Sequence, residues 1–269
     1  PMTKHKITGP DALEFLNRML TRDVSKLKPG RVSYCVWCDD EGQVIDDGTV
    51  FHMRPGEYLL CSQERQLDWL SISSLGFEVT ITEPTHELAA LAVQGPTSCA
   101  VLRKMGLNDI QNLKPFGIAW FDFQGSELMV SRTGFTGDLG YELWVDPADA
   151  ELLWDQLFSV GQVYGIQPLG EDSLEMARIE AGFLAPDVDF HGSLHTVDRG
   201  HDHSPLELAL GWIINFKKGH FSGRAALAKE KAAGKHRRLI KLDIEGNKPA
   251  ENSILYCDKG CKKTIGYVT

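Results

Sequence analysis

The chain has 269 residues, of which 42% are hydrophobic, and its formal net charge is −9 at pH 7. This length allows one large domain or two to three small ones. The acidic balance argues against nucleic acid or an anionic membrane surface as a partner, because both attract basic faces. No run approaches the roughly 20 apolar residues of a membrane helix. Six scattered cysteines do not form a dense disulfide pattern, which indicates a reducing compartment.

The first quarter of the chain predicts one helix followed by three strands. Leucines at helical spacing follow Asp11, and alternating apolar residues over 32–37, 44–53 and 58–61 predict a β meander. Further strands are expected over 77–81, 88–93, 118–123, 128–131 and 141–145, with helices around Leu67, after Pro96, after Pro147 and over 171–181. Because strands and helices do not alternate regularly, the pattern favours an α+β chain.

The last third is different in character. Residues 186–204 are polar, are rich in His and Asp, and are predicted to form a long loop. Residues 237–242 are predicted to begin a final β segment that the chain does not finish. Because Pro1 is an unusual first residue and Ile265 to Thr269 read as an interrupted strand, we expect the protein to continue beyond both ends.

Two adjacent acids, Asp46 and Asp47, lie within an apolar strand. Alternation puts Asp46 on the face of Val44 and Val50, and Asp47 on the opposite face with Ile45. Both faces are apolar, so at least one carboxylate is expected in a buried setting, where its pKa would rise. The pair is a candidate catalytic site, although acids also occur at strand ends and edges for structural reasons.

Other clusters have simpler interpretations. Glu180, near a helix end, is typical of a solvated helix face, and Gly134, Gly137 and Gly140 indicate a hairpin turn, because a strand follows them. Cys35 and Cys38 point to opposite faces of a strand, which does not suit a metal. A less favoured alternative is a divalent-ion site in the long loop, formed by His191, His195, His201, His203, Asp198 and Asp202.

Seven motifs in order resemble the glycine cleavage T-protein (aminomethyltransferase) family, which includes folate-dependent demethylases. They lie at residues 20–27, 42–47, 92–96, 131–137, 178–182, 204–212 and 221–224. The resemblance implies three domains arranged as a cloverleaf around a central folate channel. It assigns residues 1–227 to a folate-binding catalytic region of two interleaved α+β domains, and 228–269 to the start of an incomplete C-terminal β-barrel domain.

The resemblance also assigns roles to five residues. Asp46 matches the catalytic aspartate beside the folate nitrogens that carry the one-carbon unit. Glu180 matches the acid that binds the pterin edge, where a carboxylate accepts two parallel N–H bonds. Tyr34 corresponds to a ligand-facing tyrosine, Phe135 to an aromatic wall, and Lys218 to a basic position near the glutamate tail of folate. The implied cofactor is tetrahydrofolate, and no metal is expected.

Departures from the family pattern gather where the donor is expected to enter. Leu184-Ala185-Pro186 replaces a Leu-Tyr-Gly motif, the stretch from Gly182 to Ser204 is longer than usual, and Ser62 replaces an asparagine. Lipoyl carrier proteins of this system are generally acidic, and so is this chain, with a pI near 5.5. Like charges disfavour their encounter.

These observations predict a tetrahydrofolate-dependent methyltransferase or aminomethyltransferase that acts on a small N-methyl, S-methyl or related donor. One alternative is a true glycine cleavage aminomethyltransferase acting on a lipoyl carrier protein. Another is a non-catalytic folate-binding regulatory protein, although the presence of Asp46 favours an enzyme. No nucleic-acid or membrane partner is expected, and the expected location is the cytoplasm, or the mitochondrial matrix in a eukaryote.

Overall fold

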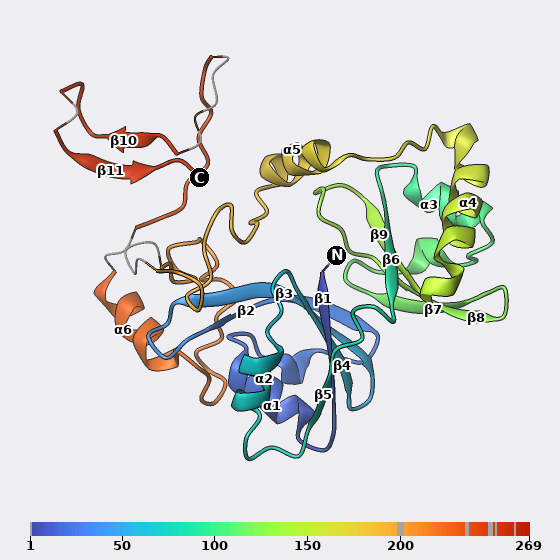
Figure 1. Ribbon diagram of the computed structural model, residues 1–269, viewed down its shortest axis with the longest axis horizontal. Helices are drawn as coiled ribbons and strands as arrows, with labels where there is room; N and C mark the ends of the chain where they lie inside the picture. The colour runs from blue at the N-terminus through green and yellow to red at the C-terminus, as the bar shows by residue number, and fades with distance from the viewer. Residues whose placement is uncertain (1, 198–201, 235–236, 247–249, 251, 261) are drawn as a thin grey trace.

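The chain folds into two antiparallel sheets with helices packed on them, followed by a C-terminal hairpin (Figure 1). The computed structural model describes residues 2–197, 202–234, 237–246, 250, 252–260 and 262–269. This mixture of helices and antiparallel sheets confirms the predicted α+β class.

The first sheet has five strands in the order β2-β3-β4-β1-β5. Its strands are β1 (Thr3–Thr8), β2 (Arg31–Cys38), β3 (Val44–Arg54), β4 (Glu57–Ser62) and β5 (Thr80–Thr82). The meander β2-β3-β4 is as predicted, and β5 starts later than expected. The interior strand β1 was not predicted, because its sequence TKHKIT is mostly polar. Pairing with β4 on one side and β5 on the other nevertheless buries it, including Lys4 and His5.

Two helices cover one face of this sheet: α1 (Ala12–Met19) and α2 (Leu67–Ser73). Phe15, Leu16 and Met19 recur on one side of α1 and pack into a core with Ile7 and Leu60 of the sheet. Burial of such an apolar stripe is what stabilises a helix as short as α1. The 3₁₀ turn Val24–Lys26 follows, with Asp23 accepting a hydrogen bond from the backbone N–H of Ser25.

β3 contains a β-bulge next to the two acids. Its pairing with β2 runs regularly up to Asp46 and resumes at Val44, so Ile45 has no partner. Asp46 and Asp47 face opposite sides of the sheet, as alternation predicts. However, Ile45 packs into the core on the side of Asp46, and Val44 packs on the other side. The expected grouping of Val44 with Asp46 is therefore wrong, because strict alternation does not include the extra residue.

The second sheet has four strands in the order β6-β9-β8-β7 and carries its own helices. Its elements are β6 (Ala89–Gln94), α3 (Ser98–Lys104), the 3₁₀ turn Ile110–Asn112, β7 (Ile118–Phe123), β8 (Ser126–Ser131), β9 (Gly140–Val145), the 3₁₀ turn Pro147–Asp149, α4 (Ala150–Gly161) and the 3₁₀ turn Gln162–Tyr164. Leu102 of α3 and Leu153 of α4 pack with Val130 and Leu143 of the sheet. Each strand and each α-helix of this unit lies where the apolar pattern predicts one, whereas the 3₁₀ turns Ile110–Asn112 and Gln162–Tyr164 were not predicted.

The remaining elements are α5 (Glu171–Ala181), α6 (Arg224–Ala233), β10 (Ile254–Tyr256) and β11 (Thr264–Tyr267). In Figure 1, α5 lies across the first sheet from α1 and α2, and the hairpin β10–β11 extends from the body near α6. The strand expected over 237–242 is wrong, because these residues have no regular structure. The boundary between residues 227 and 228 stays a prediction. Among the described residues, no helix has both the length and the apolar run needed to cross a bilayer.

Candidate active site

The two acids lie where β3 loses its neighbouring strand. Pairing of β3 with β4 begins only at Gly48 and Ser62, so the residues of β3 before Gly48 have no strand on that side. The chain after β4 and the long loop after α5 take that place. At this edge loop residues bond to the backbone of Val44, and residues after β4 bond to the Asp46 side chain.

Asp46 is almost fully buried and is held by three donors. Its carboxylate accepts hydrogen bonds from the backbone N–H of Asp47 at 2.8 Å, from the backbone N–H of Glu64 at 3.3 Å and from Gln66 Nε2 at 3.5 Å. Burial raises the pKa of Asp46 to about 7, and the neighbouring charge of Asp47 adds to that rise. Ser62, buried at the end of β4, donates to the carbonyl of Glu64 at 2.9 Å and so shapes this turn.

Asp47 is also buried, on the opposite face of the sheet, and its partner is Tyr34. The Tyr34 hydroxyl donates to Asp47 Oδ2 at 2.5 Å. Burial raises the pKa of Asp47 to about 6, against the lowering effect of the tyrosine, and the charge of Asp189 raises it further. Burial and the charge of Asp47 also raise the pKa of Tyr34, so its proton stays on the hydroxyl. Tyr34 thus lies beside the acid pair, but it contacts Asp47 and not Asp46.

Arg178 is a buried cation that the sequence analysis did not identify. Only 2% of its side chain is exposed. Its guanidinium forms ion pairs with Asp189 and with Glu175, whose Oε2 lies 2.7 Å from Nη2, and it donates to the carbonyl of Phe183 at 3.1 Å. Asp189 also accepts from the backbone N–H of Ala185 at 2.8 Å. The arginine therefore fixes the start of the long loop to α5.

The long loop packs directly on the strand that carries the acids. Ser193 donates its backbone N–H to the carbonyl of Val44 at 2.8 Å, and Gln63 Nε2 lies 3.4 Å from the carbonyl of Pro186. A Cβ at Gly192 would lie 2.3 Å from the carbonyl oxygen of Ile45, so only glycine fits there. The long loop thus contacts the two residues that precede Asp46 in β3.

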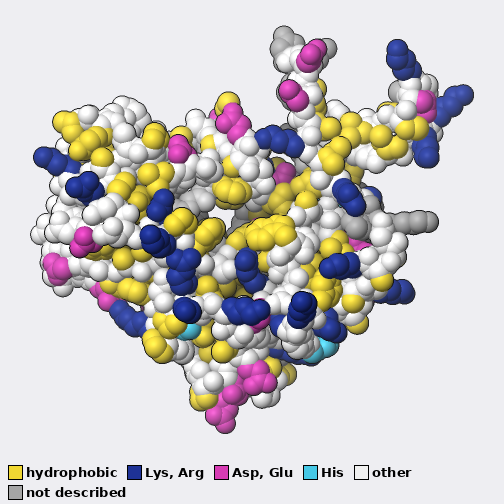
Figure 2. Space-filling view, turned by 180° about the vertical axis from the view of Figure 1, so that it is seen from behind, with side chains coloured by type: hydrophobic (Ala, Val, Ile, Leu, Met, Phe, Trp, Pro, Cys, Tyr) yellow, Lys and Arg dark blue, Asp and Glu magenta, His cyan; other side chains and the backbone are white. Residues whose placement is uncertain are grey.

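The segments that carry Glu180 and Phe135 meet at a second position. A Cβ at Gly137 would approach that of Ala181 to 2.5 Å, so the glycine-rich turn touches the end of α5. Phe135 stacks on Phe183, with ring centroids 5.7 Å apart. The Glu180 side chain is exposed, and its backbone carbonyl accepts from Lys241 at 2.7 Å. Figure 2 shows a hollow in the middle of the molecule, with apolar side chains around it.

Lys218 has its ammonium group inside the protein. Nζ donates to the backbone carbonyls of Asn17 at 2.6 Å, Arg22 at 2.7 Å and Leu20. Burial lowers the pKa of Lys218 to about 8. All three ammonium protons are used at the end of α1, where the helix dipole also favours a positive charge. Arg22 in turn donates to the carbonyl of Tyr34 at 2.9 Å, which connects this lysine to the acid pair.

The alternative of a divalent-ion site in the long loop finds no support among the described residues. Within the described part of the chain, no group of three or more His, Cys, Asp or Glu side chains is placed to hold a metal ion. Asp198 and His201 lie outside the described residues, and His203 bonds to the Tyr267 hydroxyl at 2.8 Å.

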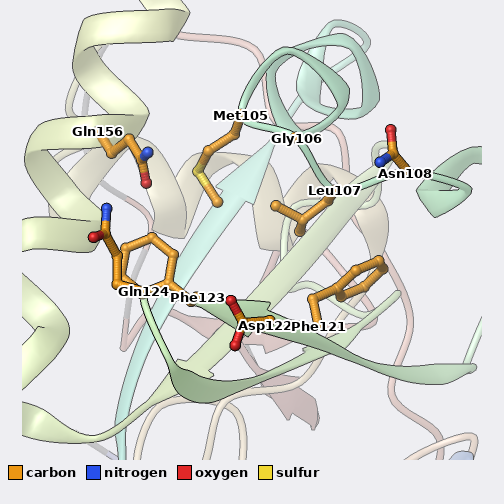
Figure 3. A pocket seen from close by; sticks show the side chains of 9 residues that line it. All are labelled: Met105, Gly106, Leu107, Asn108, Phe121, Asp122, Phe123, Gln124 and Gln156. Carbon is orange, nitrogen blue, oxygen red and sulfur yellow. The ribbon is translucent and has the colours of Figure 1, made fainter.

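Figure 3 shows a separate cavity, lined by Met105, Gly106, Leu107, Asn108, Phe121, Asp122, Phe123, Gln124 and Gln156. It belongs to the second sheet and contains none of the acids described above.

Residues 1–218 match the family model described as the GCVT N-terminal domain. The aminomethyltransferase of Halothermothrix orenii is 32% identical over 98% of this chain and 71% of its own length. That of Bacillus subtilis is 32% identical over 90% of this chain and 66% of its own length. The glycine cleavage aminomethyltransferase T of Bartonella henselae has a similar fold, with a TM-score of 0.74 at 24% identity, over 86% of this chain and 61% of that one.

The family model and these relatives define the class of this protein as a transferase. The chain belongs to the aminomethyltransferase family, the T-proteins of the glycine cleavage system, as the sequence motifs indicate. The relatives favour the alternative stated above, an aminomethyltransferase, over the expected transferase for a free small donor.

Proposed function

We propose that the protein transfers an aminomethyl-derived one-carbon unit from a lipoyl carrier protein to tetrahydrofolate. The observation that supports this most strongly is the buried Asp46 carboxylate in a chain of the aminomethyltransferase family. Tetrahydrofolate supplies the nitrogens that accept the carbon. The central folate channel of the cloverleaf arrangement corresponds in this proposal to the hollow visible in Figure 2.

Asp46 provides the charge at the reacting centre. Three donors fix its carboxylate, so little reorganisation is needed when positive charge develops nearby. A pKa of about 7 means that the group exchanges its proton near neutral pH, the range in which a general base is most effective. Asp47 and Tyr34 act through Asp46, because the charge of Asp47 raises the Asp46 pKa and Tyr34 holds Asp47.

Glu180 and the Phe135–Phe183 stack suit the pterin. An exposed carboxylate accepts two adjacent N–H groups, and a pair of parallel rings offers an apolar face to a flat heterocycle. Asp138, exposed in the glycine-rich turn that touches the end of α5, is a second carboxylate in this region. Lys218 remains a proposed determinant of tail binding; its contacts support an indirect role, through the shape of residues 17–22.

The donor assignment is tested with two classes of substrate. The purified protein and tetrahydrofolate are supplied with an aminomethylated lipoyl carrier or with a panel of N-methyl and S-methyl donors. We expect methylenetetrahydrofolate from the carrier, detected by mass spectrometry. If a small donor gives methyltetrahydrofolate and the carrier gives no methylene product, the donor is a free small molecule. That is the hypothesis that Leu184-Ala185-Pro186 suggested from the sequence. Absence of both products, with tetrahydrofolate binding intact, would favour a regulatory protein.

A further inference from the structure

Positive charge is concentrated in one part of this acidic protein. Residues 17–31, 113–118, 131–133 and 215–224, here called the basic strip, contain ten Lys or Arg residues and a single acid, Asp23. The whole chain has a net charge of −9, so charge of the two signs is strongly segregated. Figure 2 shows Lys and Arg side chains gathered across the middle of one face, next to the hollow.

Backbone contacts join the four segments of the basic strip. Ile118 donates to the carbonyl of Gly30 at 2.8 Å, and Phe116 donates to that of Arg132 at 3.0 Å. At the other end, Ser222 donates to the carbonyl of Arg18 at 3.1 Å. The four segments are therefore neighbours in the fold, although they are up to about two hundred residues apart in sequence.

Most of this charge is not neutralised within the protein. Asp23 pairs with Lys26 at 3.1 Å. Arg18, Lys28, Lys114 and Lys217 are exposed and, among the described residues, have no carboxylate within 4 Å. Unpaired exposed charges of one sign produce a field that attracts a partner of the opposite sign and accelerates its association.

Two exposed aromatic side chains accompany the strip. Trp212 is 67% exposed, and the Arg22 guanidinium lies 5.5 Å from its ring centroid. Phe116 is 47% exposed, at the segment that bonds to Arg132. Exposed aromatic and arginine side chains are characteristic anchors of protein–protein interfaces. A small anion would occupy only a short part of such a surface, so the arrangement favours a folded acidic protein.

We propose that the basic strip is the docking site for an acidic lipoyl carrier protein. The inference rests on the proposed function, since it names the carrier of that reaction. Arg22, within the strip, donates to the carbonyl of Tyr34, whose hydroxyl contacts Asp47. A carrier bound along the strip is therefore linked, through Arg22 and Tyr34, to Asp47 of the acid pair. Local charge outweighs the net repulsion that the pI of 5.5 implies.

The test compares two double charge reversals in the full chain. Lys28→Glu with Lys114→Glu changes the strip, and Lys262→Glu with Lys263→Glu changes exposed lysines of the C-terminal hairpin by the same total charge. We expect the strip variant to raise the KM for the acidic carrier about tenfold or more at low salt and to flatten its salt dependence. Its KM for tetrahydrofolate and its kcat at saturating carrier should stay unchanged, and the hairpin variant should behave as the wild type.

Four outcomes would overturn the docking site. Normal carrier turnover with an unchanged KM in the strip variant would reject it and leave the proposed function intact. Equal effects of the two double variants would show that only net charge matters. An oligonucleotide that binds the wild type as tightly as the carrier does, measured by fluorescence anisotropy, would assign the strip to nucleic acid. If the protein turns over small donors and does not turn over the carrier, both the proposed carrier substrate and the docking site are rejected.

Discussion

Tyr34 and Asp47 are joined across β2 and β3 by a hydrogen bond of 2.5 Å, on the face of the sheet opposite Asp46. Tyr34→Phe leaves the buried carboxylate without this donor, which should cost about 1–3 kcal/mol of unfolding free energy in urea titrations. Tyr58→Phe is the matched control, because Tyr58 is buried in the same sheet and its hydroxyl has no partner among the described residues. Similar losses in the two variants would mean that the bond adds little.

Asp46→Asn should retain the fold and lose about a hundredfold or more in kcat, because the amide keeps the shape but not the negative charge. Asp47→Asn should reduce kcat much less. Circular dichroism and thermal unfolding check the folds, and steady-state kinetics with tetrahydrofolate and carrier check the rates. A larger loss from Asp47→Asn at equal stability would transfer the catalytic assignment to the face that contacts Tyr34.

The pH dependence of kcat should reveal the coupling of the two acids. If ionised Asp46 is the active form, kcat rises with pH around the Asp46 pKa of about 7. The charge of Asp47 contributes to that raised pKa, so Asp47→Asn should move the rise to lower pH. An unchanged midpoint in the variant would show that the two carboxylates titrate independently.

Stability should fall as pH rises through the acidic range. Burial raises the pKa values of Asp46 and Asp47 to about 7 and about 6 in the folded state, from 3.8. Between about pH 4 and pH 7 the folded protein therefore binds more protons than the unfolded chain, and each added pH unit lowers the unfolding free energy. Denaturant titrations at several pH values should show a smaller decline for Asp47→Asn. If the unfolding free energy of Asp47→Asn declines with pH as much as that of the wild type, groups other than Asp47 cause the pH dependence.

Arg178→Met should destabilise the protein by about 3–5 kcal/mol, because it leaves Asp189 without its buried cation. Arg65→Met is the control: Arg65 pairs with Glu83 at 2.6 Å, but 69% of its side chain is exposed, and such pairs contribute about 0–1 kcal/mol. The loss should be largely recovered in Arg178→Met with Asp189→Asn, as a double-mutant cycle would measure. Additive losses would indicate that the two residues stabilise separate regions.

Glu180→Gln should weaken tetrahydrofolate binding by about 1–3 kcal/mol in calorimetry, since the amide offers one acceptor where the carboxylate offers two. Glu171→Gln, exposed at the start of the same helix, is the control. Asp138→Asn tests the neighbouring carboxylate in the glycine-rich turn. Full affinity in Glu180→Gln with a loss in Asp138→Asn would assign the pterin contact to the turn.

The sequence alone determined the class of the fold, the family and most elements. Alternation over β2 to β4, helical spacing in α1 and the turn residues between them are local patterns. Each depends on residues that are close together in the sequence, so a single sequence predicts these elements. It did not predict β1, because the burial of Lys4 and His5 depends on strands that pair from both sides, β4 and β5, and both lie far along the chain at residues 57–62 and 80–82.

Tertiary structure decided how the site residues are grouped. The bulge at Ile45 put Val44 on the unexpected face, and three carbonyls from α1 and its following turn enclosed Lys218. The ion pair of Arg178 with Asp189 joins positions that carry no mutual signal in a single sequence. The net charge follows from the composition alone. The electrostatic field depends on where the charges lie, and the segments of the basic strip come together only in the folded chain. Such groupings result from long-range contacts, and a pattern read along one chain does not contain them.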